Sequence, residues 1–106
     1  MPANYWGNHY TPHLPVGSEP LGNARWGHSD LSGSMGEWTR DAYAFEWYET
    51  TVEGCVDCLS LNPAGMRLVR GGWWQGREHD IRAAIRVRTS PLSQTIQYGM
   101  RCARDP

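Results

Sequence analysis

The sequence predicts a small, loop-rich α+β domain with a small twisted antiparallel sheet, and three observations support this fold class. Twelve glycines and seven prolines in 106 residues are typical of long loops rather than of helices. Residues 81–88 alternate apolar and polar side chains, which is the period of a strand. A chain of this length forms one domain, so residues 1–106 are interpreted as a single domain.

The first half of the chain has little periodicity. Residues 1–29 combine proline, glycine, asparagine and aromatic residues without a repeat, which predicts an extended loop. Residues 35–48 mix acidic and aromatic side chains and fit neither period, so a strand and a short irregular segment both stay open. Residues 49–65 contain Gly54, Pro63 and a close pair of cysteines, and they predict a surface excursion.

Three strands are predicted in the second half of the chain. Residues 66–74 lie between Gly65 and Gly76, and their valine and tryptophans favour a sheet. Residues 95–104 are a further candidate strand near the end of the chain. In residues 81–88, strict alternation places four apolar side chains on one face of a strand: Ile81, Ala83, Ile85 and Val87.

Composition bears on the classes of partner. The formal net charge is −1, so the balance of charges predicts binding neither to nucleic acid nor to an anionic membrane. No segment is long and apolar enough to span a bilayer, and the first residues lack the basic-then-apolar pattern of a signal peptide. All ten basic residues are arginines, which favour forked pairing with carboxylates and stacking on aromatic rings. The cellular compartment stays open.

Four motifs follow one another in a specific order. Residues 30–38 have the sequence D-L-S-G-S-M-G-E-W, and residues 70–74 have the sequence R-G-G-W-W. Residues 81–91 are I-R-A-A-I-R-V-R-T-S-P, and residues 99–104 are G-M-R-C-A-R. In this order the four motifs resemble those of the sulfatase-modifying-factor family, whose founding members are the formylglycine-generating enzymes.

The resemblance implies a C-type-lectin-like fold, which is a twisted antiparallel core wrapped in long loops. It covers roughly residues 14 to 106. Family members carry a further stretch of domain before the equivalent of Leu14, so the chain resembles the C-terminal portion of the family domain. A domain without that stretch exposes apolar surface, and self-association is therefore expected.

Asp30 and Glu37 are candidate ligands of a calcium ion, which takes about six to eight oxygens from carboxylates, carbonyls and water. Gly33 can adopt the backbone angles of a curl between them. From Gly33 onward, residues two apart in an extended chain point their carbonyls to the same side, which groups Gly33, Met35 and Glu37. On spacing alone, the alternative is a turn at Asp30 and an ion pair between Glu37 and an arginine. The family resemblance implies a structural calcium held by the side chains of Asp30 and Glu37 and the carbonyls of Gly33 and Met35.

The copper site that the resemblance would imply has no counterpart in the sequence. In formylglycine-generating enzymes, two cysteines follow the R-G-G motif, bind copper and oxidise a substrate cysteine, and soft thiolates of this kind select Cu(I). Gly76 stands in the place of the first cysteine, and the second is absent from a shorter segment. Trp73 replaces the usual serine. Copper binding is therefore not expected, and the formylglycine activity is not carried over.

The three cysteines allow three interpretations. A local disulfide between Cys55 and Cys58 is the most economical in an oxidising compartment, and it leaves Cys102 as a buried thiol. A zinc site would require all three cysteines and a histidine to converge. A redox-active pair would normally open a helix in a parallel α/β unit, which the sequence does not predict.

His79 is the one candidate for acid–base chemistry. It lies between Glu78 and Asp80, where it is either a general base or part of a solvated turn. The other histidines are scattered, without the spacing of a metalloprotease helix or an iron site.

The arginines of the predicted strands have two interpretations. In the first, they line a groove for a carboxylate or a sugar, with aromatic rings as stacking platforms. In the second, they form an internal lattice in which Arg82 and Arg86 pair with acidic side chains such as Glu37 and Asp41 or with the backbone. The members of the predicted groove are Trp73, Trp74, Arg86 and Tyr98.

Two functions follow from the sequence. The first is a noncatalytic member of the sulfatase-modifying-factor family, a calcium-stabilised scaffold that presents the groove to a peptide or a glycan. The alternative is an oxidoreductase that converts a substrate cysteine to formylglycine, or an accessory subunit of such an enzyme.

Overall fold

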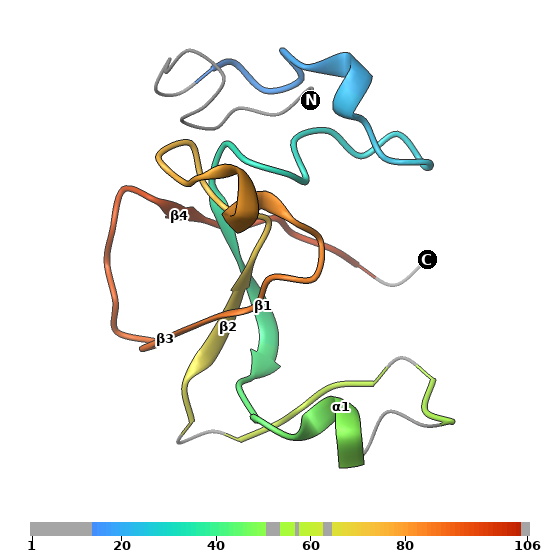
Figure 1. Ribbon diagram of the computed structural model, residues 1–106, viewed down its shortest axis with the longest axis vertical. Helices are drawn as coiled ribbons and strands as arrows, with labels where there is room; N and C mark the ends of the chain where they lie inside the picture. The colour runs from blue at the N-terminus through green and yellow to red at the C-terminus, as the bar shows by residue number, and fades with distance from the viewer. Residues whose placement is uncertain (1–13, 51–53, 57, 63–64, 105–106) are drawn as a thin grey trace.

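The computed structural model describes residues 14–50, 54–56, 58–62 and 65–104. In chain order they form η1 (Pro20–Gly22), β1 (Gly36–Ala42), α1 (Trp47–Thr50), β2 (Arg67–Arg70), η2 (Glu78–Ile81), β3 (Val87–Thr89) and β4 (Tyr98–Gly99), where η denotes a 3₁₀ helix. The segment that contains η1 lies over one end of the sheet, and α1 lies beyond the other end (Figure 1). A small sheet with a few short helices confirms the predicted α+β class. None of the helices among these residues has the length and apolar character needed to cross a membrane.

The strands of the described chain form one mixed sheet in the order β3-β2-β1-β4. β2 is antiparallel to both β1 and β3, whereas β4 is parallel to β1, so the sheet is not purely antiparallel as predicted. β4 can approach β1 because Gly36 has no side chain. A Cβ at this position would lie 2.8 Å from Val69 Cγ1 and 3.0 Å from Tyr98 Cδ1. The Gly36 amide instead donates a hydrogen bond to the Gln97 carbonyl (2.8 Å).

β1 contains an irregularity in its ladder with β2. Trp38 pairs with Val69 and Ala42 pairs with Arg67, so a longer stretch of β1 faces a shorter stretch of β2. The Thr39 hydroxyl donates to the Leu68 carbonyl (3.1 Å) within this stretch and adds a side-chain contact between the two strands.

The buried core surrounds β2 on both of its faces. Tyr98 lies at one margin of this core, where its ring makes edge-to-face contacts with Trp38 (centroids 5.7 Å apart) and Trp73 (6.2 Å). The buried apolar residues are Ala42, Leu68, Val69, Trp74 and Ile81.

The strand predicted over residues 81–88 is wrong for most of its length, because the segment begins at the end of η2 and only its end belongs to β3. The Asp80 carboxylate accepts a hydrogen bond from the backbone amide that precedes η2 (2.8 Å) and closes this short helix. The Arg70 guanidinium then donates to the carbonyls of Ala83 (3.2 Å) and Ile85 (3.0 Å). Ala83 is exposed, so the alternating apolar residues do not share one buried face.

The other strands are shorter than predicted. β2 ends at Arg70 because Gly71 and Gly72 have positive φ angles of 93° and 69°, which end an extended strand. Residues 95–104 contribute only the two residues of β4.

The segments that the sequence left less defined also acquire structure. Residues 35–48 contain the whole of β1 and the start of α1. η1 interrupts the loop predicted for residues 1–29, of which residues 1–13 lie outside the described chain.

Gly72→Ala is expected to lower the free energy of unfolding by about 2 kcal/mol or more. The physical reason is twofold, since φ is positive and the new Cβ would lie 2.7 Å from the Asp80 carbonyl oxygen. Gly27→Ala is the matched control, because φ there is 84° but no atom lies within 4 Å of the new Cβ. Its expected loss is about 1 kcal/mol. Urea denaturation measures both variants, and equal losses would contradict the role of the close contact at Gly72.

Candidate functional site

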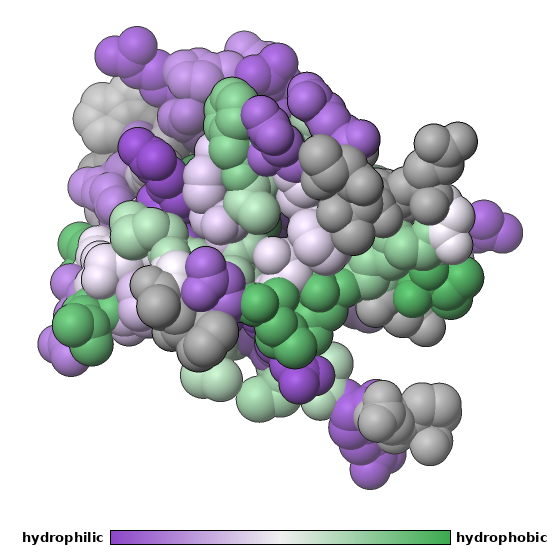
Figure 2. All heavy atoms as spheres, turned by 90° about the horizontal axis from the view of Figure 1, so that it is seen from below, coloured by the Kyte–Doolittle hydropathy of each residue, from purple (hydrophilic) through white to green (hydrophobic). Residues whose placement is uncertain are grey.

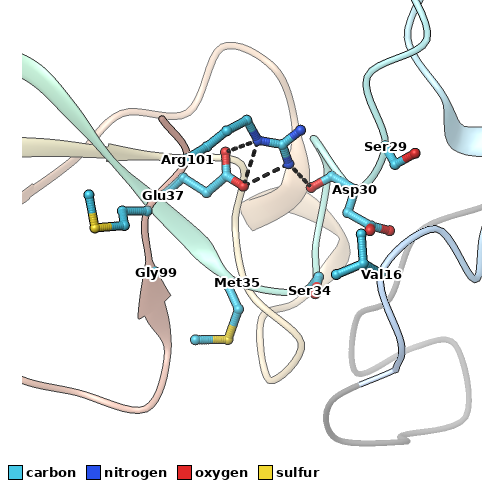
Figure 3. Close-up of a pocket in the computed structure, with 9 residues that line it drawn as sticks. Val16, Ser29, Asp30, Ser34, Met35, Glu37, Gly99 and Arg101 are labelled. Atoms are coloured by element: carbon cyan, nitrogen blue, oxygen red, sulfur yellow. Dashed lines mark hydrogen bonds and ion pairs between the residues drawn. The ribbon is translucent and has the colours of Figure 1, made fainter. Parts of the chain in front are cut away.

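Three of the four predicted calcium ligands line one pocket of about 310 Å³ beside the start of β1. Its walls come from the loop before η1, the segment that leads into β1, β1 itself and the residues after β4 (Figure 3). Gly33, the fourth predicted ligand, is buried and does not line the pocket. The residues that determine the chemistry of the pocket are Val16, Ser29, Asp30, Met35, Glu37 and Arg101.

The backbone that leads into β1 is held by the loop that follows β2. The Gly33 amide donates to the Gly71 carbonyl (2.6 Å), and the Trp74 amide donates to the Ser34 carbonyl (2.8 Å). The segment is also joined to the end of η2, because the Ser32 hydroxyl donates to its last carbonyl (2.8 Å). The R-G-G-W-W motif (residues 70–74) therefore contacts the D-L-S-G-S-M-G-E-W motif (residues 30–38) directly through backbone hydrogen bonds.

The backbone between Asp30 and Met35 is not extended. Asp30, Gly33 and Ser34 have positive φ angles of 57°, 79° and 61°, and the strand begins only at Gly36. The prediction that the carbonyls of Gly33, Met35 and Glu37 lie on one side of an extended chain is therefore wrong. The chain turns at Gly33 and Ser34 because both residues bond to the loop after β2.

The Glu37 carboxylate is held by Arg101. Arg101 Nη2 lies 2.8 Å from Glu37 Oε1, and Arg101 Nε lies 3.1 and 3.2 Å from the two carboxylate oxygens. The pair is partly exposed, with 35% of the arginine side chain and 25% of the glutamate side chain accessible. Its contribution to stability is therefore modest, about 1 kcal/mol, while its fork geometry fixes the orientation of the carboxylate.

The Asp30 carboxylate points away from Glu37. It accepts a hydrogen bond from the Gly17 amide (2.8 Å) and lies against the loop that carries Val16 (Figure 3). The Asp30 carbonyl accepts a long hydrogen bond from Arg101 Nη2 (3.5 Å). This arrangement is the alternative that spacing alone favoured, in which Asp30 lies in a turn and Glu37 pairs with an arginine.

The side chains of the pocket fit calcium in their chemistry. Two carboxylates and nearby carbonyls are the hard oxygen donors that calcium prefers. Both carboxylates already bind protein groups, so an ion must compete with Arg101 for Glu37 and with the Gly17 amide for Asp30. Within the described residues, no group of three or more histidine, cysteine or acidic side chains gathers to hold a metal. A calcium ion here would therefore need backbone carbonyls as well as the carboxylates.

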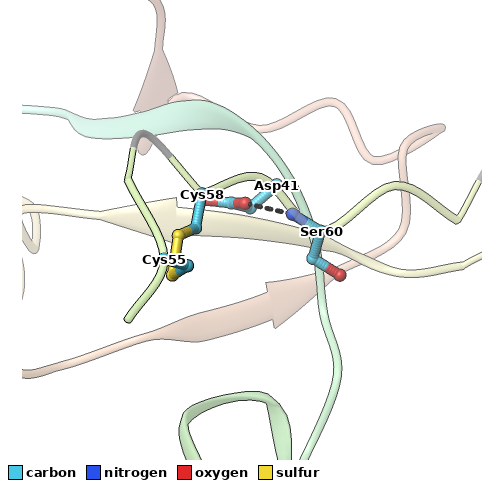
Figure 4. Close-up of a disulfide and its surroundings, with 4 residues drawn as sticks. All are labelled: Asp41, Cys55, Cys58 and Ser60. Carbon is cyan, nitrogen blue, oxygen red and sulfur yellow. Dashed lines mark hydrogen bonds between the residues drawn. A yellow bond between two sulfur atoms is a disulfide. The ribbon is translucent and has the colours of Figure 1, made fainter. Parts of the chain in front are cut away.

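Cys55 and Cys58 form a disulfide in the loop between α1 and β2 (Figure 4). The loop is attached to β1 close to this bond. The Ser60 amide donates to Asp41 Oδ1 (2.9 Å), and the Ala42 amide donates to the Ser60 carbonyl (2.8 Å). Asp41 therefore anchors this loop, in contrast to the predicted pairing of Asp41 with an arginine.

Cys102 is exposed, so the prediction of a buried thiol is wrong. It follows β4, and the residues from Met100 to Arg104 are exposed as the chain leaves the sheet. The disulfide uses the other two cysteines, which leaves the zinc interpretation without its thiolates.

His79 is exposed and lies in η2. Its Nε2 is 3.0 Å from Asp80 Oδ1, and the other oxygen of Asp80 accepts the amide of Arg77. This is the solvated turn that the sequence offered as the alternative to a general base. Asp80 closes the turn of η2 through the amide of Arg77.

The predicted groove members do not share one surface. Trp74 is only 5% exposed and belongs to the core, whereas Trp73 and Tyr98 contact each other at the margin of the core. The Arg86 guanidinium lies over the Tyr43 ring instead, 5.9 Å from its centroid. Arg82 donates to the His79 carbonyl (3.1 Å), which is a backbone partner of the kind that the second interpretation allowed, but Arg82 is exposed and so is not part of an internal lattice.

The sequence alone does not identify two side chains that contact predicted site residues, Arg101 beside Glu37 and Tyr43 beside Arg86. Arg101 lies within the predicted strand over residues 95–104, and its place in the G-M-R-C-A-R motif is the signal that could identify it as the partner of Glu37. Tyr43 was not singled out, because a single aromatic residue after a strand gives no local signal. Both assignments depend on which strands are neighbours in the sheet.

A family model described as "Sulfatase-modifying factor enzyme 1-like domain" matches residues 1–106. The serine/threonine-protein kinase Pkn1 of Chlamydia trachomatis serovar L2 is 32% identical over 103 residues, which are 97% of this chain and 16% of the relative. The serine/threonine-protein kinase pkn1 of Chlamydia caviae is 29% identical over 102 residues, 96% of this chain and 16% of the relative. The chain thus spans only 16% of the length of these curated relatives. No solved structure matches the chain.

Thiol titration of the unfolded protein is expected to find one reactive cysteine before reduction, because Cys55 and Cys58 are joined and Cys102 is free. After reduction, all three cysteines of the sequence are expected to react. Cys102→Ser is the matched control and should remove the single signal of the unreduced protein. Three reactive thiols before reduction would contradict the disulfide.

Proposed function

The chain belongs to the family of sulfatase-modifying factor enzyme 1-like domains, and we propose that it is a noncatalytic binding domain of this family with a calcium-stabilised, C-type-lectin-like fold. The small mixed sheet and the long loops support the lectin-like fold in their general architecture. The ligand we propose is a peptide or a glycan, and the copper reaction of the family is absent.

The local structure at Gly76 carries the proposal that the domain is noncatalytic. Gly76 stands where the resemblance places the first copper-binding cysteine, and it is buried in a tight turn, with its amide donating to the Trp73 carbonyl (2.8 Å). A Cβ at Gly76 would lie 2.9 Å from that same carbonyl oxygen and 3.3 Å from Asp80 Cβ. The turn therefore has no room for a cysteine side chain without a shift of the backbone.

The remaining cysteines do not supply a substitute pair. Cys55 and Cys58 are joined to each other, and Cys102 is a single exposed thiol. A Cu(I) centre of the family type requires two thiolates.

The pocket beside β1 is the proposed calcium site. Asp30 and Glu37 would supply carboxylates, and Met35 would supply a carbonyl. Gly33 does not line the pocket, so its carbonyl would reach the ion only after a shift of the turn that contains it. A bound ion would supply positive charge that draws these oxygens together, as Arg101 now does for Glu37 and the Asp30 carbonyl. The Glu37 carboxylate would therefore have two competing cations, which are the bound ion and the guanidinium of Arg101.

Exposed hydrophobic side chains support contacts with a ligand or with a second copy of the chain. On the face seen from the end where α1 lies, such side chains reach the surface among polar ones (Figure 2). Among the exposed hydrophobic residues, Phe45 (79% exposed) precedes α1 in the sequence, and Val56 (86%) and Leu61 (67%) belong to the segment between α1 and β2. At the opposite end, Val16, Leu21 and Trp26 are also exposed. Self-association remains a proposal on this basis.

Calcium at about a hundredfold excess over its Kd is expected to raise Tm by about 10 °C, because an ion that binds only the folded state stabilises it by mass action. Asp30→Ala is expected to abolish the gain. Arg101→Gln is expected to enlarge it, because Glu37 loses its competing partner.

Asp80→Ala is the matched control for the loss of a carboxylate. Asp80 lies outside the pocket, so this variant is expected to have a lower starting Tm and an unchanged gain with calcium. Scanning calorimetry in calcium and in chelator measures all four proteins. An identical Tm of the unmodified chain in both conditions would contradict the calcium proposal.

A copper-loaded sample of the chain is expected to leave a cysteine-containing sulfatase peptide unchanged, because no pair of thiolates is available. Mass spectrometry of the peptide measures the outcome, with a formylglycine-generating enzyme that has both cysteines as the positive control. Loss of the cysteine sulfur in the presence of this chain would favour the oxidoreductase instead.

A further inference from the structure

Two tight turns from distant parts of the chain meet at the margin of the core. The first is closed by the Gly76 amide, which donates to the Trp73 carbonyl (2.8 Å). The second is closed by the Tyr98 amide, which donates to the Thr95 carbonyl (3.4 Å). Each turn contains one aromatic residue, and the ring centroids of Trp73 and Tyr98 are 6.2 Å apart with the ring planes at 80°. The two turns therefore hold a pair of rings in an edge-to-face arrangement.

Each turn also contains one glutamine, and the two glutamines bind each other. Gln97 Nε2 donates to Gln75 Oε1 (3.1 Å). Gln75 is exposed and Gln97 is half-buried. An amide side chain has two N–H donors and one carbonyl acceptor, so this bond leaves the Gln75 amino group and the Gln97 side-chain carbonyl without a hydrogen-bond partner among the described residues. The pair therefore presents a donor and an acceptor close together at an accessible surface.

A third ring comes from β1. A Cβ on Gly36 would lie 3.0 Å from Tyr98 Cδ1, so the Tyr98 ring lies against the backbone of β1 at this point. Trp38 is two residues further along the strand, so its side chain projects from the same face, and its ring centroid is 5.7 Å from that of Tyr98. Trp38, Trp73 and Tyr98 form an aromatic cluster, and all three are half-buried rather than buried. Part of the cluster is therefore open to a ligand.

The aromatic cluster lies on the face of the sheet opposite to the calcium pocket. Side chains alternate between the two faces of a strand, so Glu37 projects away from the face that carries Trp38. Glu37 pairs with Gly99 in the register of β1 and β4, and its carboxylate meets Arg101 in the pocket (Figure 3). The cluster and the two glutamines contain no acidic or basic side chain, whereas the pocket contains both kinds. The two sites are therefore separate in position and in chemistry.

An uncharged pyranose matches these groups. In the β-gluco configuration the ring has apolar C–H groups on both faces and hydroxyls around its rim, so one face can lie on an aromatic ring while the rim faces polar groups. A hydroxyl both donates and accepts, so adjacent hydroxyls can use the Gln75 amino group and the Gln97 carbonyl together. A proline-rich peptide also stacks on aromatic rings, but its backbone offers only carbonyl acceptors and would leave the Gln97 carbonyl unused. The amide pair therefore favours a glycan.

We propose that the aromatic cluster and the Gln75–Gln97 pair bind one uncharged, β-linked pyranose unit of a glycan. The inference rests on the proposed function of a binding domain, and it narrows the ligand from a peptide or a glycan to a neutral glycan. One sugar unit contacts a small surface, so the Kd is on the order of 1 mM. Calcium in the pocket is not required, because the two sites lie on opposite faces of the sheet.

The probe is cellotetraose, added at up to about 10 mM to the isotope-labelled chain and followed by NMR spectroscopy. We expect shifts of the indole N–H signals of Trp38 and Trp73 and of the side-chain amide signals of Gln75. Trp26 is the internal control, because it is 76% exposed on the segment that contains η1 and takes no part in the cluster. Equal shifts at Trp26, or no shift of the cluster over this range, would overturn the inference.

Gln75→Ala should weaken the binding of cellotetraose about fivefold, because the sugar loses one hydrogen bond. Gln75 is exposed, so its replacement leaves the core in place. Gln94→Ala is the matched control, because Gln94 is also exposed and immediately precedes the second turn but is not part of the amide pair. An equal loss in both variants would overturn the role of the amide pair.

Two further titrations separate this inference from the proposals on which it depends. A decaproline peptide should leave the indole signals unchanged; if it shifts them and cellotetraose does not, the glycan is overturned while a binding function stands. Cellotetraose should bind equally in calcium and in chelator, and binding only in calcium would overturn the assignment to the aromatic cluster. Conversion of the sulfatase peptide in the copper assay would overturn the noncatalytic function separately, since that assay does not use the cluster.

Discussion

The hydrogen bonds that join Gly33 and Ser34 to the loop after β2 hold together two motifs that are distant in the sequence. They exist because Gly71 and Gly72 adopt positive φ angles and bring the backbone of that loop against residues 31–35. A Cβ on Gly71 would lie 2.9 Å from the Leu31 carbonyl oxygen, so a side chain would separate the two segments. Each bond contributes only about 1 kcal/mol, yet together they determine where β1 begins and how the pocket is built.

In the proposed calcium site, the Glu37 carboxylate would serve two cations. Glu37 is the second residue of β1, and β4 runs parallel to β1 at this point, which brings Arg101 within hydrogen-bonding distance. The ion pair is partly exposed, so its contribution to stability is small, but it neutralises the carboxylate while no ion is bound. An arginine in this place makes the proposed calcium site a competition between a fixed guanidinium and a diffusible ion.

The two ends of β1 have different chemistry. Oxygen donors gather at its start, beside the segment that contains η1, whereas two arginines lie over the ring of Tyr43, the residue that follows its end. The turn at Gly76, where the family's first copper ligand would stand, is closed by backbone contacts. The proposed recognition role draws on this distribution, in which the sheet separates two surfaces of different chemistry.

The order of the four motifs was sufficient to assign the family, and the density of glycine and proline was sufficient to predict a loop-rich α+β domain, because both properties are contained in the sequence itself. Local spacing also drew attention to Asp30 and Glu37, which line the same pocket. The prediction of a strand over residues 81–88 failed because alternation cannot anticipate the carboxylate that closes η2 or the distant arginine that takes the carbonyls of the following loop. Only the tertiary structure decided that Arg101 is the partner of Glu37 and that Tyr43 holds Arg86 and Arg88. Those contacts depend on which strands are neighbours, and strand order is a property of the folded sheet rather than of any local segment.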